Sequence, residues 1–224
     1  MPHWKAPLKL LTGQFEAAAN EQHAKAMQQY MRDQYPFYGI KAPTRQGIQK
    51  EFFLTLAGPE KIIEPELARN IWKLPQREWQ LMGCDLLFRF AKKAPKQHLA
   101  VYEELIQTKS WWDTVDMLAS KVVAVHLQRH PELLTKTAQR WIESDNLWLQ
   151  RSALIFQLKY KDQTDWPLLQ ELIRRRIDEP DFFIRKAIGW SLRAYARHQP
   201  DAVRAFVASH NLSPLSRKEA LKHL

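Results

Sequence analysis

Two stretches of the sequence decide the fold: Arg151-Ser-Ala-Leu-Ile-Phe-Gln-Leu158 and Arg185-Lys-Ala-Ile-Gly-Trp-Ser-Leu192. They align position by position at an offset of 34 residues, and a weaker copy starts at Gly83. The first stretch belongs to a run over residues 148–161 that has the length and the residue types of a helix. Strand-like alternation is hard to find elsewhere in the chain. We therefore expect an all-α protein built from a repeated unit.

Regularly spaced prolines mark the same repeat. They follow one another at intervals of 36, 36, 36 and 33 residues, and each opens a segment with a helical pattern: Pro59, Pro95, Pro131, Pro167 and Pro200. Proline suits the first turn of a helix, because the N–H that it lacks would have no partner there. A period of 33 to 36 residues with two helices is typical of an α-solenoid.

The domain prediction follows from this period. We expect one curved domain over residues 1–224, in which residues 59–224 form the helix-pair repeats. Residues 1–58 lack the period, and they are predicted to form an N-terminal helical cap whose main helix runs from about Gln14 to Asp33.

Composition excludes several classes of function. The single cysteine, Cys84, rules out an internal disulfide and a multi-cysteine metal site, and six glycines leave no glycine-rich phosphate loop. No apolar run reaches the ~18 residues that a membrane span needs. The first residues also lack the apolar segment of a signal peptide. We therefore expect a soluble, cytoplasmic protein without a membrane partner.

The charge of the chain favours a polyanionic partner. Lysine and arginine number 34 against 24 acidic residues, which gives a net charge of +10. Up to residue 139 there are 19 basic and 14 acidic residues, and 15 and 10 follow, so the excess is not a detachable tail. Nucleic acid fits such a body, and a charge that serves only solubility is the alternative.

One short segment, Lys109-Ser-Trp-Trp-Asp-Thr-Val-Asp116, carries a candidate site. Ser110 is predicted to cap a helix, with Asp113 in the capping role three positions later. Trp112 and Asp116 are four positions apart and would share one helix face. A purely structural role of Asp116 at the helix dipole is the alternative. Four other tryptophans are expected in the core: Trp72, Trp79, Trp141 and Trp166.

Three long motifs in this order resemble the AlkD family of bacterial DNA glycosylases. They are Ser110-Trp-Trp-Asp-Thr-Val-Asp116, the run over residues 146–161 and the run over residues 181–196. The likeness extends to Gly39-Ile-Lys-Ala-Pro43 near the N-terminus and to residues 212–220 at the end, so it covers nearly the whole chain.

The resemblance implies both the architecture and the reaction. The family is built from HEAT-like repeats whose concave, basic surface holds duplex DNA. Its members excise alkylpurines that carry a positive charge, chiefly 7-methylguanine and 3-methyladenine, without enclosing the base in a pocket. No metal, organic cofactor or obligate protein partner is implied, and neither is strand nicking. A monomer is expected.

The resemblance also assigns residues by motif position. Motif position gives the catalytic set Asp116, Trp112 and Trp190 and the DNA-binding residues Arg151 and Tyr30. Four further DNA-binding candidates are Arg185, at the equivalent position of the next repeat, Lys41, and Phe182 and Phe183, of which one is expected to pack and the other to approach the duplex. Each assignment has an alternative. Arg151 could form an ion pair instead of holding a phosphate, and Arg185 could be only a repeat residue. Trp190 could belong to the core, with Gly189 beside it permitting close helix packing.

The chain departs from the family pattern at one place, and two alternative functions fit parts of the sequence. The family often has polar residues after Gly-Ile in its N-terminal DNA-facing segment, where this chain has Lys41 and Ala42, so a contact from Ala42 is in doubt. A HEAT-like module that binds distorted DNA without catalysis is the first alternative function, and such relatives lack the Trp–Asp pair that is present here. A protein-binding scaffold is the second, and it predicts weak DNA binding driven by charge alone.

Overall fold

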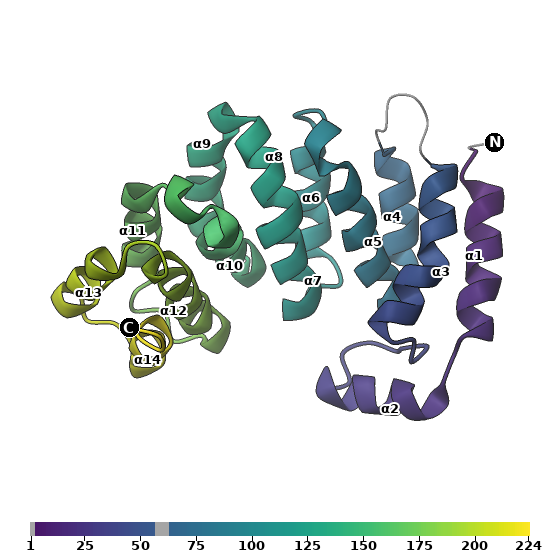
Figure 1. Cartoon of the computed structure of the whole chain (residues 1–224), viewed down its shortest axis with the longest axis horizontal. Coiled ribbons are helices and arrows are strands. Elements are labelled where there is room, and N and C mark those ends of the chain that lie inside the picture. Colours follow the sequence, from purple (N-terminus) through teal and green to yellow (C-terminus); the bar gives the residue numbers. More distant parts are fainter. Residues whose placement is uncertain (1–2, 57–62) are drawn as a thin grey trace. The chain divides into compact units, whose positions relative to one another are not determined.

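The computed structural model describes residues 3–56 and 63–224. Every regular element within these ranges is helical, which confirms the predicted all-α class (Figure 1). The chain divides into two compact units, the first up to His98 and the second from Leu99 onward. None of the described helices is long and apolar enough to cross a membrane. That residues 1–224 form one domain stays a prediction.

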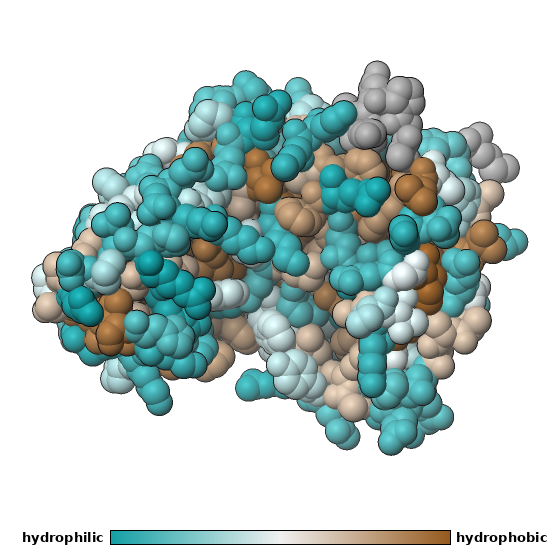
Figure 2. Space-filling view, in the orientation of Figure 1, coloured by the Kyte–Doolittle hydropathy of each residue, from teal (hydrophilic) through white to brown (hydrophobic). Residues whose placement is uncertain are grey.

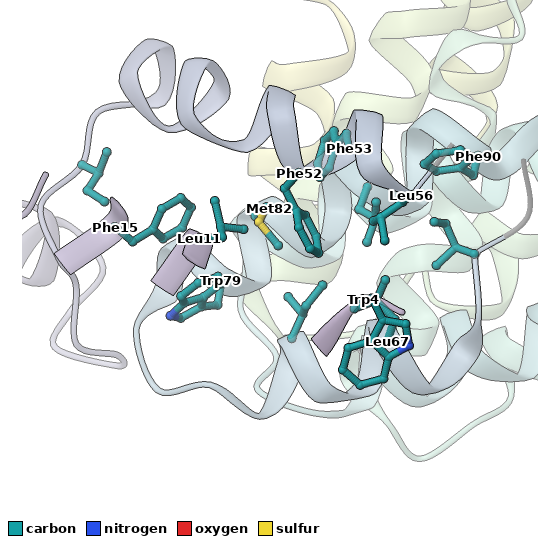
Figure 3. Close-up of a cluster of buried hydrophobic side chains, with 14 residues drawn as sticks. Trp4, Leu11, Phe15, Phe52, Phe53, Leu56, Leu67, Trp79, Met82 and Phe90 are labelled. Atoms are coloured by element: carbon teal, nitrogen blue, oxygen red, sulfur yellow. The ribbon is translucent and has the colours of Figure 1, made fainter. Parts of the chain in front are cut away.

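The first unit is organised around one hydrophobic core. Its elements are α1 (Lys5–Ala17), α2 (Glu21–Tyr30), α3 (Ala42–Thr55), α4 (Pro65–Lys73), α5 (Arg77–Phe90) and the 3-10 turn η1 (Ala91–Lys93). α3 packs on α1 and α5, and α4 packs on α5. Figure 3 shows the buried side chains between them, where the ring of Phe15 stacks on Trp79 with centroids 4.5 Å apart.

The N-terminal helix is interrupted, so the prediction of one helix from about Gln14 to Asp33 is wrong. Asn20 lies between α1 and α2 with an extended backbone, φ −140° and ψ 110°. Its side chain accepts a hydrogen bond from the His23 N–H at 2.9 Å, and its own N–H donates to the Tyr38 carbonyl at 2.8 Å. The asparagine therefore caps α2 instead of continuing α1.

The second unit consists of stacked helices. They are α6 (His98–Gln107), α7 (Trp112–Met117), the π-helical turn η2 (Leu118–Val123), α8 (Ala124–Arg129), α9 (Pro131–Ile142), α10 (Leu147–Ile155), the 3-10 turns η3 (Phe156–Lys159) and η4 (Lys161–Gln163), α11 (Trp166–Arg175), α12 (Phe182–Ala196), α13 (Pro200–Ser209) and α14 (Pro214–Ala220). α10 packs on α9 and α12, α12 packs on α13 and α14, and α9 packs on α11. Alternate helices therefore stack on one another, as predicted for an α-solenoid (Figure 1).

Proline marks the start of most, but not all, of the predicted helices. Pro131, Pro167 and Pro200 lie in the first turns of α9, α11 and α13, as predicted. Pro95 does not open a helix, because α6 begins three residues later, after a turn. Pro59, and with it the predicted start of the repeats, lies outside the described residues.

The helix predicted over residues 148–161 is shorter than expected. α10 ends at Ile155, and the chain continues through the tight turns η3 and η4. The Tyr160 hydroxyl donates to the Ala124 carbonyl at 2.7 Å, so this ring is held against the neighbouring helix α8. Lys161 then takes a left-handed backbone conformation, with φ 56°, which a continuing α-helix would not allow.

Gly189 permits the close packing of α12 on α14 that was one interpretation of this residue. A Cβ atom at this position would lie 2.4 Å from the Cβ of Glu219 and 2.9 Å from the Ser216 carbonyl oxygen. Any larger side chain would therefore push the two helices apart.

Three of the four tryptophans predicted in the core are buried. Trp72, Trp79 and Trp141 are buried. Trp166 is half-buried and stacks on the ring of Tyr195, with centroids 4.7 Å apart. On the face shown in Figure 2, hydrophilic side chains predominate and hydrophobic ones form small separate patches. Small apolar patches of this kind are ordinary on a protein surface.

Candidate active site

The start of α7 presents the candidate residues, although Ser110 does not cap the helix as predicted. The Ser110 hydroxyl donates to the Ile106 carbonyl of α6 at 2.6 Å, so the preceding helix uses it. Trp111 takes the capping position with an extended backbone, and its side chain makes no capping bond. Asp113 does lie in the first turn, where a carboxylate interacts favourably with the positive end of the helix dipole.

The central feature of the second unit is an ion pair between Asp116 and Arg151. The Arg151 Nε donates to one carboxylate oxygen at 2.7 Å, and one Nη donates to the other at 2.8 Å. The second Nη donates to the Phe183 carbonyl at 2.6 Å. The side chains of Arg151 and Asp116 are only 6% and 15% exposed. The pair is therefore bidentate and largely removed from water.

This pairing concerns the two interpretations of Arg151, a phosphate contact or an ion pair. The ion pair that was the alternative to a phosphate contact is present, and its partner is the candidate catalytic residue itself. A guanidinium has five N–H donors, and the bonds to Asp116 and Phe183 use three of them. A phosphate contact through the other donors stays a prediction.

Burial and the guanidinium act on Asp116 in opposite directions. Burial raises the pKa of the Asp116 carboxyl above its ordinary value of 3.8, whereas the hydrogen bonds and the charge of Arg151 oppose the rise. The negative charge of Asp113 adds a smaller upward contribution to the same pKa. The ionised state of Asp116 therefore depends on Arg151.

A π-helical turn follows the carboxylate directly. η2 begins two residues after Asp116, and the Ser120 hydroxyl donates to the Asp116 carbonyl at 2.6 Å. Single π-turns within helices are rare and occur frequently at functional sites. The turn links the backbone of Asp116 to the segment that carries Ser120.

Three aromatic rings from different elements form a cluster beside the ion pair. The centroid of Phe183 lies 5.3 Å from that of Trp111 and 5.0 Å from that of Trp148, and the two indoles are 5.8 Å apart. The guanidinium carbon of Arg151 lies 5.8 Å from the Phe183 centroid. Sequence reasoning missed Trp111 and Trp148. Their position inside the two motifs was the signal that could have found them.

The predicted tryptophans are both half-buried, but they occupy different places. Trp112 is the first residue of α7, on the same short helix as Asp116. Trp190 lies on α12 and lines a cavity of 250 Å³ together with Ser120. Ser120, whose hydroxyl donates to the Asp116 carbonyl, thus shares a cavity with Trp190.

The remaining predicted DNA contacts of the second unit lie at the start of α12. Phe182 is 55% exposed, whereas Phe183 packs in the aromatic cluster. The Nε of Arg185 donates to the Glu179 carbonyl at 3.1 Å, so this side chain also holds the segment that leads into α12.

The two N-terminal candidates, Tyr30 and Lys41, belong to the first unit. Tyr30 ends α2, is 72% exposed and lines a cavity of 360 Å³ with mostly apolar walls. Lys41 is exposed and precedes α3, and Ala42 is the first residue of that helix. A role of either residue in DNA binding stays a prediction.

Within residues 3–56 and 63–224, no three His, Cys, Asp or Glu side chains are grouped so that they could hold a metal ion.

Two comparisons with known proteins point to the same family. The family model described as DNA alkylation repair enzyme matches residues 11–224. No curated protein matches the sequence. Among solved structures, the chain is similar to a predicted DNA alkylation repair enzyme from Enterococcus faecalis, with 30% sequence identity and a TM-score of 0.85. That match covers 92% of this chain and 96% of the other. The chain therefore belongs to the DNA alkylation repair enzyme family.

Proposed function

We propose that this protein is a monofunctional DNA glycosylase. It hydrolyses the N-glycosidic bond of positively charged N3- and N7-alkylated purines in duplex DNA, with 7-methylguanine and 3-methyladenine as substrates. One observation carries the proposal: a buried carboxylate, Asp116, is held by Arg151 beside tryptophans in a chain of the DNA alkylation repair enzyme family.

The substrate supplies much of the driving force. Alkylation at N3 or N7 makes the base a cation, so the bond from C1′ to nitrogen breaks with both electrons going to the base, which leaves as a neutral molecule. A general acid is therefore unnecessary, and one carboxylate suffices where glycoside hydrolases use two.

Asp116 acts on what remains, a deoxyribose with positive charge at C1′. The ionised carboxylate stabilises this oxocarbenium-like cation, orients the attacking water and accepts the proton that the water loses. Trp112 and Trp190 contact the deoxyribose with their electron-rich faces, which favour positive charge. Arg151 keeps Asp116 ionised and in place, and its remaining donors hold the DNA backbone.

The same proposal covers the partner and the setting. Duplex DNA is the binding partner, the protein acts as a monomer in the cytoplasm, and Tyr30, Lys41, Phe182, Phe183 and Arg185 are further DNA contacts. The base is not enclosed in a pocket, so its own charge and lability select it. Detectable excision of 7-methylguanine without any excision of a bulky N7 adduct would contradict this mode of selection.

Single-turnover excision of 7-methylguanine from a duplex oligonucleotide in EDTA tests the proposal. The wild type should release the base, and Asp116→Asn should abolish release while duplex binding stays equal or becomes tighter, because a negative charge beside DNA is removed. Asparagine keeps one oxygen for Arg151, which limits the cost of leaving the guanidinium without its partner.

Asp113→Asn is the matched control, since it makes the same change one turn earlier and should retain excision. Circular dichroism and thermal unfolding establish that each variant is folded. Loss of binding together with loss of activity in a folded Asp116→Asn protein would assign Asp116 a structural role. A wild type that binds the duplex without releasing the base would be a non-catalytic DNA-binding module.

A further inference from the structure

The first unit holds an apolar cavity beside a buried guanidinium. The cavity measures 360 Å³, and α2, α3, α5 and the segment between α2 and α3 supply its lining: Ala26, Met27, Tyr30, Met31, Phe37, Ile40, Ala42, Arg45, Glu78 and Leu81. Most of these side chains are apolar, and methionine adapts its shape to a bound group. A cavity of this size and composition is typical of a site for a small molecule.

Arg45 brings an unused hydrogen-bond donor to this lining. Its side chain, in the first turn of α3, is only 5% exposed. One Nη donates to the Asp85 carboxylate at 3.1 Å, whereas the other Nη is buried and has no hydrogen-bond partner in the part of the chain that the structure describes. Burial lowers the pKa of the guanidinium, and the charge of Asp85 opposes this only in part. A ligand with an acceptor atom would remove the cost of leaving this donor unsatisfied.

The acidic residues near Arg45 determine the charge of such a ligand. Asp85 accepts a hydrogen bond from the Gln49 amide at 3.0 Å as well as from Arg45. Glu78 lines the cavity, is 1% exposed and accepts from the backbone N–H groups of residues 38–40 at 2.9 to 3.0 Å. One guanidinium therefore lies close to two carboxylates. A further negative charge would be repelled here, so a neutral acceptor is favoured.

The segment between α2 and α3 is held in place at several points. Besides its three bonds to Glu78, its Tyr38 carbonyl accepts from the Asn20 N–H at 2.8 Å. Gly39 has φ 84°, and a Cβ atom there would lie 2.1 Å from the Asn20 carbonyl oxygen. The cavity that this segment lines is therefore formed before a ligand arrives, which lowers the entropic cost of binding.

We propose that this cavity binds a small, uncharged, apolar molecule that carries a carbonyl oxygen, such as a ketone, ester or amide. The carbonyl accepts from the unused Nη of Arg45, and the apolar body packs against Met27, Met31 and Leu81. This hydrogen bond satisfies the buried donor and adds no charge beside Glu78. The proposal is independent of the glycosylase reaction, because all of the lining residues belong to the first unit.

Three probes with the same naphthalene body test the chemistry of the site. Acetylnaphthalene carries a neutral carbonyl, ethylnaphthalene replaces it with a hydrocarbon group, and naphthoate carries a charged carboxylate. Equilibrium dialysis against the full chain without DNA gives the Kd of each probe from the absorbance of the naphthalene ring. Acetylnaphthalene should bind saturably. Naphthoate should bind more weakly than acetylnaphthalene, because the carboxylates of Glu78 and Asp85 repel it.

Arg45→Met tests the hydrogen bond. The substitution removes the donor and leaves an apolar side chain in the wall, so acetylnaphthalene should lose affinity and ethylnaphthalene should keep it. The ratio of the two Kd values should change by about tenfold to a hundredfold, as expected for a hydrogen bond from a charged donor. Gln46→Met, at the next and exposed position of α3, is the matched control and should leave the ratio unchanged. Because the ratio compares two ligands on one protein, a general loss of stability does not mimic the effect.

Ala26→Trp tests the location of the probe. Ala26 is an exposed residue of α2 that lines the cavity, so an indole here should fill the space and abolish binding. Ala17→Trp, at an exposed position of α1 outside the described lining, should retain it. Circular dichroism and thermal unfolding establish that each variant is folded. This pair decides the location even if Arg45→Met does not fold.

Four results would overturn the proposal. They are the absence of saturable acetylnaphthalene binding, binding that survives Ala26→Trp, a ratio of Kd values that Arg45→Met leaves unchanged, and tighter binding of naphthoate than of acetylnaphthalene. The last of these would make the cavity a site for an organic anion.

Discussion

Asp116 and Arg151 lie on different helices, α7 and α10, and each constrains the other. The guanidinium supplies two donors to the carboxylate, and a third donor fixes it to the Phe183 carbonyl of α12. A single side chain thus ties the candidate catalytic group to two further helices of the second unit. Such a pair contributes geometry more than stability, because taking both charges out of water offsets much of their attraction.

The pH dependence of excision follows from this pair. Burial raises the pKa of Asp116 above its ordinary value of 3.8, so the carboxylate takes up its proton at a higher pH than an ordinary aspartate. If the ionised form is required, activity falls as the pH falls through that raised pKa. Arg151→Gln removes the charge that opposes the rise, so its acid limb should lie at a still higher pH.

Single-turnover rates of 7-methylguanine release from about pH 4 to 8 measure both limbs, after subtraction of the rate without enzyme. Folding of Arg151→Gln is checked by circular dichroism at each end of this range. Acid limbs at the same pH in the two proteins would show that Arg151 does not stabilise the ionised carboxylate.

The sequence predicted those site residues that neighbouring positions or a motif mark, and not the contacts between distant segments. Trp112 and Asp116 stand out because helical spacing places them on one face, and the motif resemblance adds Trp190 and Arg151. The partner of Arg151 was left open between a phosphate and a carboxylate, since an ion pair across 35 residues depends on tertiary structure. Trp111 and Trp148 were missed for the same reason, because their cluster joins separate elements.

At the scale of elements, Gly189 sets how closely α12 packs on α14. Gly189→Ala should destabilise the protein, since the new Cβ would lie 2.4 Å from the Glu219 Cβ. We expect a loss of about 1–3 kcal/mol in the free energy of unfolding, the usual cost of overpacking. Urea denaturation followed by circular dichroism measures it.

Gly47→Ala is the matched control for this prediction. Gly47 lies inside α3, and a Cβ there would meet no atom within 4 Å. Because alanine favours the helix, this change should stabilise the protein by about 0.4–1 kcal/mol. Equal changes in the free energy of unfolding for the two substitutions would show that α12 and α14 move apart at little cost.

Helix starts were easier to predict than helix ends. Pro131 and Pro200 mark the first turns of α9 and α13, because the fixed φ and the missing N–H of proline suit the first turn of a helix and not its interior. The break at Asn20 had a local signal that was missed, because asparagine is a favoured helix cap and its side chain accepts from the His23 N–H. The early end of α10 at Ile155 is different, since the bond from Tyr160 to Ala124 joins separate segments and local sequence does not encode that partner.

For the whole molecule, the net charge of +10 leads to a prediction about salt. If the protein makes ~5 phosphate contacts, the slope of log K against log salt should be about −4.5. Kd values for an undamaged duplex between about 50 and 300 mM salt measure this slope. A binding constant that does not change with salt would contradict a surface that follows the DNA backbone. It would favour the alternative of a protein-binding scaffold.

The π-helical turn η2 sets the rotational phase between Asp116 and the helix that follows. A π-turn holds one residue more than an α-helical turn, and each residue of an α-helix rotates the chain by about 100°. Loss of any one residue from Leu118–Val123 would restore a regular helix and turn Asp116 away from Arg151. The length of this segment therefore matters to the site as well as its side chains. An in-frame deletion of one codon here would be as harmful as the loss of the aspartate itself.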